Sequence, residues 1–326
     1  MGLGQAKFDY GTHETAVFKS DDVAEAEIQS DGCQKNHSNY LEVKDLTLDS
    51  LPQGYQEPDM LELVKSLASL TVRISVMYSS LERRKFWQGT EANYPGYNCR
   101  GSDTCLTGSG RICDVYEDTK YELTCLCSDC KEPISGSERR AVWHIWVYSA
   151  THVVYNSVEA EKSVFKLFYD TSEGKRKTFY GVKVLWSNIT GDLCLLSCVT
   201  CDKELADELD QSLKGLISIW KRIRENYKRD KTLEDDARKY KDRIVVIVSH
   251  PHGGPKKVSF GQLHSKERKK IGSDNGWHIN YLANTCSGSS GAPVYLYGMD
   301  WFKSEYVHSG SNSDVNYSTT WSPEEK

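Results

Sequence analysis

Short stretches in which apolar and polar residues alternate recur along most of this 326-residue chain. In one of them Val72, Ile74, Val76 and Tyr78 alternate with polar residues, which predicts a strand with one buried face. Further strands are expected around 108–112 and at 142–148, 164–169, 178–185, 192–199, 243–248, 258–261, 278–282, 294–297 and 305–308. Many short strands separated by turn residues predict an antiparallel barrel or sandwich.

Two segments instead repeat their apolar residues every three or four positions, which predicts amphipathic helices. The shorter is 59–70 and the longer is 203–226. The apolar face of the longer segment consists of Leu205, Leu209, Leu213, Leu216, Trp220 and Ile223. This helix separates an early group of strands from a later one, so the pattern predicts a mainly β protein with a helical insert.

These patterns divide the chain into five parts. We expect a polar, partly disordered N-terminal extension at 1–58, because it lacks a hydrophobic period. A first β-barrel with a cysteine-rich loop follows at 59–201, and a helical insert at 202–242. A second β-barrel is expected at 243–312, with a disordered tail at 313–326.

Composition and charge narrow the class of protein. No apolar run approaches the roughly 18 residues of a membrane-spanning helix, and the first residues lack the apolar core of a secretory signal. We therefore expect an intracellular, cytoplasmic protein, although glycosylation triplets at Asn188 and Asn316 leave unconventional secretion open. The net charge is -5, and acidic residues interrupt the basic clusters at 221–224 and 266–270, which favours solvated faces over a nucleic-acid groove. The oligomeric state is left open.

The chain has 11 cysteines, which we interpret as thiols or metal ligands rather than as a disulfide framework. Cys125, Cys127 and Cys130 form a C-x-C-x-x-C group that could hold a structural zinc, with Cys99 or Cys105 as a fourth ligand. A reduced, cysteine-rich surface loop is the alternative. A second group lies in an apolar run and is expected to consist of buried, inert thiols: Cys194, Cys198 and Cys201.

The most informative segment is Thr-Cys-Ser-Gly-Ser-Ser-Gly-Ala-Pro-Val at 285–294, in which Ser290 is the candidate nucleophile. A serine hydroxyl needs an imidazole as general base and a carboxylate that orients the imidazole. His152 follows an apolar strand in Ser-Ala-Thr-His, and Asp192 precedes another strand in Gly-Asp-Leu-Cys-Leu-Leu. Each element alone has a structural interpretation, but together they occur in the order His, Asp, Ser.

The three segments resemble those of chymotrypsin-like serine proteases. The resemblance implies two antiparallel six-stranded β-barrels, with His152 and Asp192 on the first, Ser290 on the second, and the site in the cleft between them. It also implies that the amides of Gly288 and Ser290 form the oxyanion hole. Ser289 replaces the aspartate of the zymogen-activated enzymes, and the chain has no Ile-Val-Gly-Gly segment. The chain is therefore similar to the non-zymogen branch, which includes cellular trypsin-like peptidases and glutamyl endopeptidases.

Two further residues match the pocket of the glutamyl endopeptidases. Thr285 stands five residues before Ser290, and His308 lies on the strand that should line the pocket, although Tyr306 replaces the usual glycine. The match predicts cleavage after Glu or Gln. In the alternative, Thr285 caps the nucleophile turn and His308 is a packed strand residue. The pair His250 and His252 could share a metal ion, but its Ser-His-Pro-x-Gly context favours a turn.

Together these features predict a serine endopeptidase that hydrolyses polypeptides and requires no cofactor. The alternative is a catalytically silent relative that binds a partner peptide or nucleic acid through the cleft or the basic helix.

Overall fold

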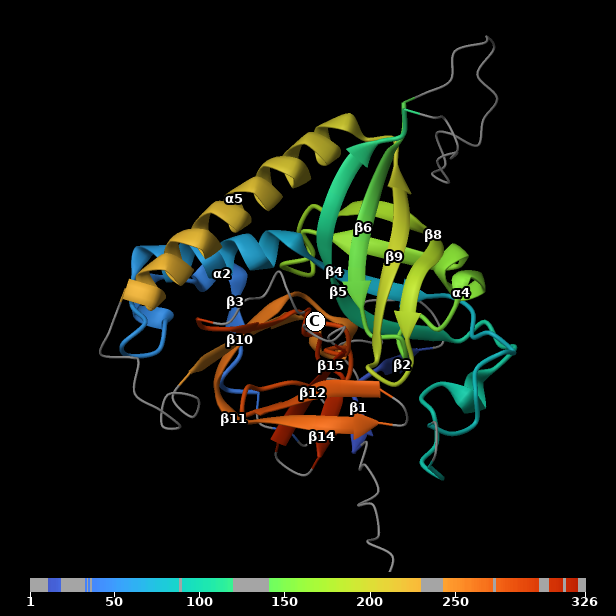
Figure 1. Ribbon diagram of the computed structural model, residues 1–326. Coiled ribbons are helices and arrows are strands. Elements are labelled where there is room, and N and C mark those ends of the chain that lie inside the picture. Colours follow the sequence, from blue (N-terminus) through green and yellow to red (C-terminus); the bar gives the residue numbers. More distant parts are fainter. Residues whose placement is uncertain are drawn as a thin grey trace, which may run out of the picture.

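The structure is a computed structural model (Figure 1), and it describes residues 11–18, 33, 35, 37–87, 90–119, 141–229, 243–271, 274–298, 305–312 and 315–321. The cysteines at 125, 127 and 130, predicted as zinc ligands, lie outside the described residues. Most of the described strands belong to two antiparallel sheets, one above the other in Figure 1.

The first sheet closes into a barrel of six strands. They are β4 (Thr71–Val76), β5 (Cys105–Glu117), β6 (Trp143–Ser149), β7 (Ser163–Leu167), β8 (Lys177–Asn188) and β9 (Leu193–Thr200). The order is β5-β4-β7-β8-β9-β6, and β6 pairs back with β5. Because β5 and β6 close the ring, this sheet leaves few unpaired strand edges. The short helices η3 (Tyr97–Cys99) and α4 (Ser157–Glu161) lie in its connections.

The second sheet supplies the other barrel. Its strands are β10 (Ile244–Ser249), β11 (Lys257–Ile271), β12 (Asp274–Tyr281), β13 (Val294–Leu296), β14 (Gly310–Asn312) and β15 (Val315–Trp321). The order is β14-β15-β12-β11-β10-β13, and a bridge between Pro293 and Val307 joins the two ends of this path. The two antiparallel barrels, with helix α5 (Lys203–Arg229) between them in the sequence, confirm the predicted fold class.

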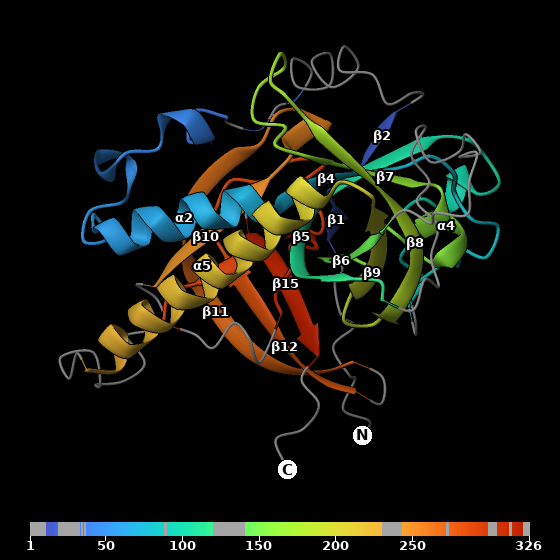
Figure 2. The same ribbon diagram turned by 90° about the horizontal axis from the view of Figure 1, so that it is seen from above.

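Two helices cover one side of the barrels. Helix α2 (Pro58–Leu70) and helix α5 (Lys203–Arg229) pack against each other, as Figures 1 and 2 show. The apolar face predicted for the longer helix is buried in the same core as the barrel strands. The basic residues of α5 are partly paired, since Arg222 binds Asp59 and Glu62 of α2. The helical insert is thus part of the packing that joins the two barrels.

The folded region begins before Pro58, which corrects the predicted extension. Strand β1 (Thr12–His13) pairs with β14, β2 (Ala16–Phe18) pairs with β5, and β3 (Leu41–Glu42) pairs with β11. The turns η1 (Val43–Asp45) and η2 (Leu48–Ser50) follow β3, and Leu46 and Leu51 are buried in the main core. Edge pairing of this kind uses backbone groups, so it leaves little hydrophobic period in the sequence.

The predicted tail at 313–326 is also wrong in part, because β15 lies between β12 and β14. Its buried positions include Ser318 and Thr319 as well as Tyr317. Small hydroxyl residues in a covered strand conceal the apolar alternation that the prediction relied on.

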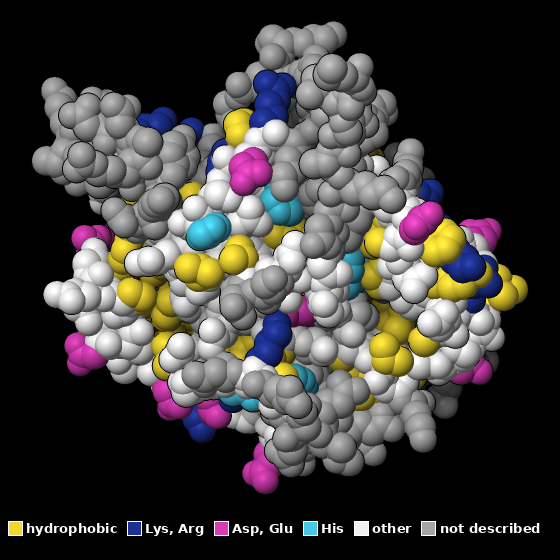
Figure 3. Space-filling view, turned by 90° about the horizontal axis from the view of Figure 1, so that it is seen from below, with side chains coloured by type: hydrophobic (Ala, Val, Ile, Leu, Met, Phe, Trp, Pro, Cys, Tyr) yellow, Lys and Arg dark blue, Asp and Glu magenta, His cyan; other side chains and the backbone are white. Residues whose placement is uncertain are grey.

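No helix in the described part of the chain is both long and apolar enough to span a membrane. On the face shown in Figure 3, the described Lys and Arg side chains are scattered among acidic and apolar ones.

Candidate active site

His152 and Asp192 form a buried pair at one end of the first barrel. His152 follows β6 and Asp192 precedes β9, and these strands are neighbours in register from Ser149 opposite Cys194. The His152 Nδ1 atom lies 2.6 Å from Asp192 Oδ2, and the His152 amide donates to Asp192 Oδ1 over 3.0 Å. Because an ionised carboxylate only accepts, Nδ1 carries the proton and Nε2 is left with its lone pair. This is the tautomer that a general base needs.

A buried ion pair between Arg83 and Glu159 contacts the backbone of His152. The Arg83 guanidinium bonds both carboxylate oxygens of Glu159 at 2.6 and 2.7 Å. It also donates to the carbonyl oxygens of His152 and Val153 at 2.9 and 3.2 Å. Both charged side chains are fully buried. Sequence reasoning missed this pair, because no motif separates Arg83 from the other arginines before the fold is known.

Ser290 lies in the turn that precedes β13, at the junction of the barrels. Ser109 of β5 holds this turn from the first barrel: its amide donates to the Ser290 carbonyl over 2.7 Å, and its hydroxyl donates to the Gly288 carbonyl over 2.8 Å. Gly288 has a φ of +93°, and a Cβ there would lie 2.4 Å from the His250 carbonyl oxygen. Only glycine fits this position without a shift of the backbone.

The Ser290 hydroxyl and the His152 ring are not hydrogen-bonded to each other in the described structure. Ser290 Oγ donates to the Ser309 carbonyl over 3.5 Å, and His152 Nε2 is buried without a hydrogen-bond partner. The ring of His13 packs edge-on against the His152 ring, with 4.8 Å between centroids. His152 is fully buried, and a residue of the N-terminal segment covers part of its ring.

That segment places Glu14 in the site. The amides of Gly288 and Ser290 both donate to the Glu14 carbonyl oxygen, over 2.5 and 3.3 Å. Before Glu14, β1 runs antiparallel to β14; after it, β2 runs antiparallel to β5. Two amides that converge on one carbonyl oxygen beside a serine are the geometry of an oxyanion hole. The predicted donors thus lie together, and a carbonyl of the same chain lies between them.

The Glu14 side chain is buried and fully paired. His308 Nε2 lies 2.8 Å from Glu14 Oε2, the Ser311 hydroxyl donates to Oε1 over 3.3 Å, and Lys35 forms an ion pair with Oε1. Burial alone would raise the pKa of this carboxyl, but His308 and Lys35 outweigh it and lower the pKa to about 2. The pocket therefore stabilises a negatively charged side chain.

His308 is oriented by a second contact, because its Nδ1 atom lies 2.7 Å from the Tyr281 hydroxyl. The Tyr281 hydroxyl also donates to the Tyr317 carbonyl over 3.3 Å, so its oxygen can accept from Nδ1. Both ring nitrogens of His308 can then donate, one to Tyr281 and one to Glu14.

Thr285 lies at the pocket, but its side chain does not contact the Glu14 carboxylate in the described structure. Its hydroxyl donates to Asn316 Oδ1 over 2.8 Å, and its carbonyl accepts from Lys35 Nζ over 3.2 Å. Lys35 and Ser311 were not predicted. Lys35 lies in the segment interpreted as an extension, and nothing in its local sequence indicates a pocket.

The remaining candidates have structural environments. Burial raises the pKa of the Cys194 and Cys198 thiols well above the usual value, and Cys201 is half-buried. His250 Nδ1 lies 2.9 Å from the Gly254 carbonyl at the turn η5 (Pro251–Gly253), as the turn interpretation predicts. His252 instead faces His37, with 3.3 Å between their Nε2 atoms.

Several solved structures align with most of this chain, all at low sequence identity. A protease of Mycobacterium tuberculosis, Rv3671c in its active form, aligns over 83% of this chain and 82% of its own, with 13% identity and a TM-score of 0.41. Deg5 aligns over 82% and 90%, with 12% identity and a TM-score of 0.39. The HtrA-type protease AlgW with a tripeptide aligns over 79% and 58%, with 10% identity and a TM-score of 0.40.

No protein-family model matches the chain, and no curated protein matches it. Proteins this distant in sequence can differ in activity even when their strands are arranged alike. The chemistry of this chain therefore depends on its own side chains.

Proposed function

We propose that this protein is a serine endopeptidase that cleaves polypeptides after glutamate. The observation that carries the proposal is the position of Glu14, whose carbonyl oxygen accepts from the Gly288 and Ser290 amides while its carboxylate contacts His308. A scissile residue in a serine protease needs both contacts at once: donors for the developing oxyanion and a pocket for the side chain.

In the proposed reaction, Ser290 Oγ attacks the carbonyl carbon and His152 Nε2 accepts the hydroxyl proton. Asp192 keeps the proton on Nδ1 and stabilises the imidazolium through the 2.6 Å contact. The negative charge that forms on the carbonyl oxygen is held by the two amides. His152 then gives its proton to the leaving amine, and water completes hydrolysis of the ester by the same route.

The pocket contacts support glutamate as the preferred residue. A carboxylate with His308, Lys35 and Ser311 around it makes charge-assisted hydrogen bonds, which are stronger than those of an amide. Glutamine has the same shape, but its amide group would face donors and lose part of this stabilisation. We therefore propose glutamate over glutamine, and both over basic or large apolar residues.

The absence of a hydrogen bond between Ser290 and His152 in the described structure favours a second candidate, a catalytically silent fold that only binds an extended peptide. A fluorophosphonate probe separates the two, because it labels only an activated serine. The test uses a Glu14→Ala chain, so that the segment's own carboxylate does not fill the pocket, and a matched Ser290→Ala chain as control. We expect labelling and hydrolysis of a peptide copy of residues 10–20 in the first and neither in the second. A folded Glu14→Ala chain that remains unlabelled between pH 6 and pH 9 would establish the silent alternative.

A further inference from the structure

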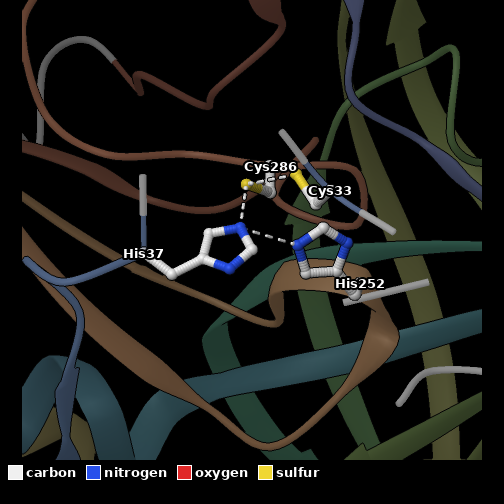
Figure 4. A group of neighbouring side chains, drawn as sticks. All are labelled: Cys33, His37, His252 and Cys286. Atoms are coloured by element: carbon white, nitrogen blue, oxygen red, sulfur yellow. Dashed lines mark hydrogen bonds between the residues drawn. The ribbon is translucent and has the colours of Figure 1, made fainter. Parts of the chain in front are cut away.

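Four side chains from distant parts of the chain converge on one point beside the turn that carries Ser290. They are Cys33 and His37 of the N-terminal region, His252 of the turn η5, and Cys286, four residues before Ser290 (Figure 4). Their ligand atoms all lie within 4.8 Å of one another. None of the four takes part in the proposed hydrolysis.

The separations of these atoms can be compared with those of a zinc site. Zn–S bonds of about 2.3 Å and Zn–N bonds of about 2.0 Å in a tetrahedron place the two sulfurs about 3.8 Å apart, the two nitrogens about 3.3 Å apart, and each sulfur about 3.5 Å from a nitrogen. Here the sulfurs of Cys33 and Cys286 are 3.8 Å apart, the Nε2 atoms of His37 and His252 are 3.3 Å apart, and Cys286 Sγ lies 3.3 Å from His37 Nε2. All three separations in the structure are compatible with one zinc ion.

The ligand types and their places in the sequence fit as well. Two thiolates and two imidazoles are a common structural zinc set, and Cys33 and His37 have the spacing Cys-x-x-x-His. His252 has a φ of +56°, a conformation that costs energy for a residue other than glycine. Binding of a metal ion by the His252 ring can offset this cost, because the strained backbone places the ring at a ligand position.

We propose that Cys33, His37, His252 and Cys286 bind one structural zinc ion, which fastens the N-terminal region to the second barrel. The ion joins the segment that carries Lys35 to the loop that carries Ser290. Because Lys35 lies between the two N-terminal ligands and contacts Glu14 and the Thr285 carbonyl, the zinc also fixes one wall of the pocket. These four ligands are different residues from the cysteines predicted as zinc ligands at 125, 127 and 130.

The test measures bound metal on the full chain, purified after growth with added zinc. Elemental analysis compares the unsubstituted chain, Cys33→Ser, His37→Ala and the matched control Cys99→Ser. It also includes the triple variant Cys125→Ser/Cys127→Ser/Cys130→Ser, called the triple-serine chain. We expect the first two substitutions to remove one zinc per chain relative to the unsubstituted protein. The control and the triple-serine chain should each retain that ion.

Cobalt substitution in the triple-serine chain provides a second readout that does not depend on how the other variants fold. A tetrahedral site with two thiolates should give intense d–d absorption and a sulfur-to-cobalt charge-transfer band, both lost on adding Cys33→Ser. The proposal is overturned if the triple-serine chain binds no zinc. It is also overturned if Cys33→Ser and His37→Ala keep the full amount, or if the intact mass reveals a Cys33–Cys286 disulfide instead.

A different observation, the path of residues 11–18, carries a second inference, which rests on the proposed function. The chain pairs with the second barrel through Thr12 and His13, and with the first barrel through residues 16–18. The bond between Glu14 and Thr15 therefore crosses from one barrel to the other where Ser290 and the oxyanion donors lie. An intact substrate would follow the same path.

We infer that the protein cleaves its own Glu14–Thr15 bond. Ser290 Oγ bonds to the Glu14 carbonyl carbon, the bond to Thr15 nitrogen breaks, and that nitrogen takes the proton from His152. Water then hydrolyses the Glu14 ester, leaving a carboxylate at Glu14, an amine at Thr15 and a regenerated Ser290. The reaction consumes one water and needs no other reactant.

Mass spectrometry of the full chain after incubation tests this inference. We expect a new N-terminus at Thr15, formed at a rate independent of protein concentration, and none in Ser290→Ala or Glu14→Lys. Glu14→Lys should still react with a fluorophosphonate, which shows that the machinery is intact. A protein that is labelled and hydrolyses the peptide but leaves its own bond intact would overturn self-cleavage alone. A folded Glu14→Ala chain that is neither labelled nor active would instead overturn the proposed function, because its own glutamate does not fill the pocket.

Discussion

His308 offers the sharpest test of the pocket, through replacement with alanine. The substitution removes the 2.8 Å contact with the Glu14 carboxylate in a site where His308 is fully buried. A hydrogen bond to a charged group contributes about 1.5–3 kcal/mol, so kcat/KM for a glutamate substrate should fall roughly 10- to 150-fold. A glutamine substrate loses only a neutral hydrogen bond and should slow less. The preference for Glu over Gln should therefore shrink.

The assay compares fluorogenic peptides based on residues 11–18 that differ only at the position of Glu14, with Glu, Gln or Lys. All enzymes carry Glu14→Ala, so that the chain's own glutamate does not compete. His264→Ala serves as the matched control, because His264 is an exposed histidine of β11. The reasoning is refuted if His308→Ala lowers hydrolysis of the Glu and Gln peptides by the same factor, since that result indicates a structural role.

Three further substitutions, two of them with matched controls, test the residues that support the site. Gly288→Ala places a Cβ 2.4 Å from a carbonyl oxygen and disturbs a proposed oxyanion donor, so kcat should fall about 100-fold or more. The control Gly215→Ala lies in α5 with open space around it, and it should raise the free energy of unfolding by about 0.5–1 kcal/mol. Arg83→Met leaves Glu159 buried without its partner, so denaturant titration should show a free energy of unfolding lower by about 3–5 kcal/mol. The control Arg222→Met removes an exposed ion pair and should leave the melting temperature almost unchanged. Because the pKa of Glu14 is lowered to about 2, its charge stabilises the docked segment fully above about pH 4.5 and less as the pH falls toward 2. In an inactive background, Glu14→Gln should therefore lower the free energy of unfolding by about 3 kcal/mol at pH 7 and by much less at pH 3. A loss of stability that does not change with pH would contradict the assignment.

The parts of the fold that the sequence predicted are those in which side-chain burial determines the pattern. The helix at 203–226 buries one face, so its apolar residues repeat with the helical period. The strand predicted from residue 72 onward is present as β4, but all of its residues are buried, so the expectation of one exposed face was wrong. Its alternation separates apolar side chains from buried polar ones such as Arg73 and Ser75.

The triad candidates were found for another reason, because serine chemistry requires a base and a carboxylate in a fixed arrangement. The structure places His152 Nδ1 2.6 Å from Asp192 Oδ2, whereas Ser290 Oγ donates to the Ser309 carbonyl, and the catalytic roles of the three stay a prediction.

The parts that the sequence did not predict depend on contacts between residues far apart in the chain. Strand β1 is held by backbone pairing to β14, about 300 residues away, which leaves no period in a short polar segment. Lys35 is exposed for nearly half of its side chain, and only its distance to Glu14 distinguishes it from other surface lysines. Cys33 and His37 match a zinc spacing, but their partners His252 and Cys286 are separated from them by more than 200 residues.

The N-terminal segment also has a consequence for activity toward other proteins. Residues 11–18 occupy the proposed oxyanion hole, the pocket that binds the Glu14 carboxylate and strand positions on both barrels, so an external substrate must displace all of these contacts. A tethered segment acts at an effective concentration of roughly millimolar or more, which exceeds that of most substrates in solution. Uncleaved protein should therefore turn over external peptides slowly, and removal of Glu14 from the pocket should raise that rate. Cleavage at Glu14–Thr15 frees the strand positions on β14 while β2 can remain on β5, so one turnover on the chain itself would open the site for others.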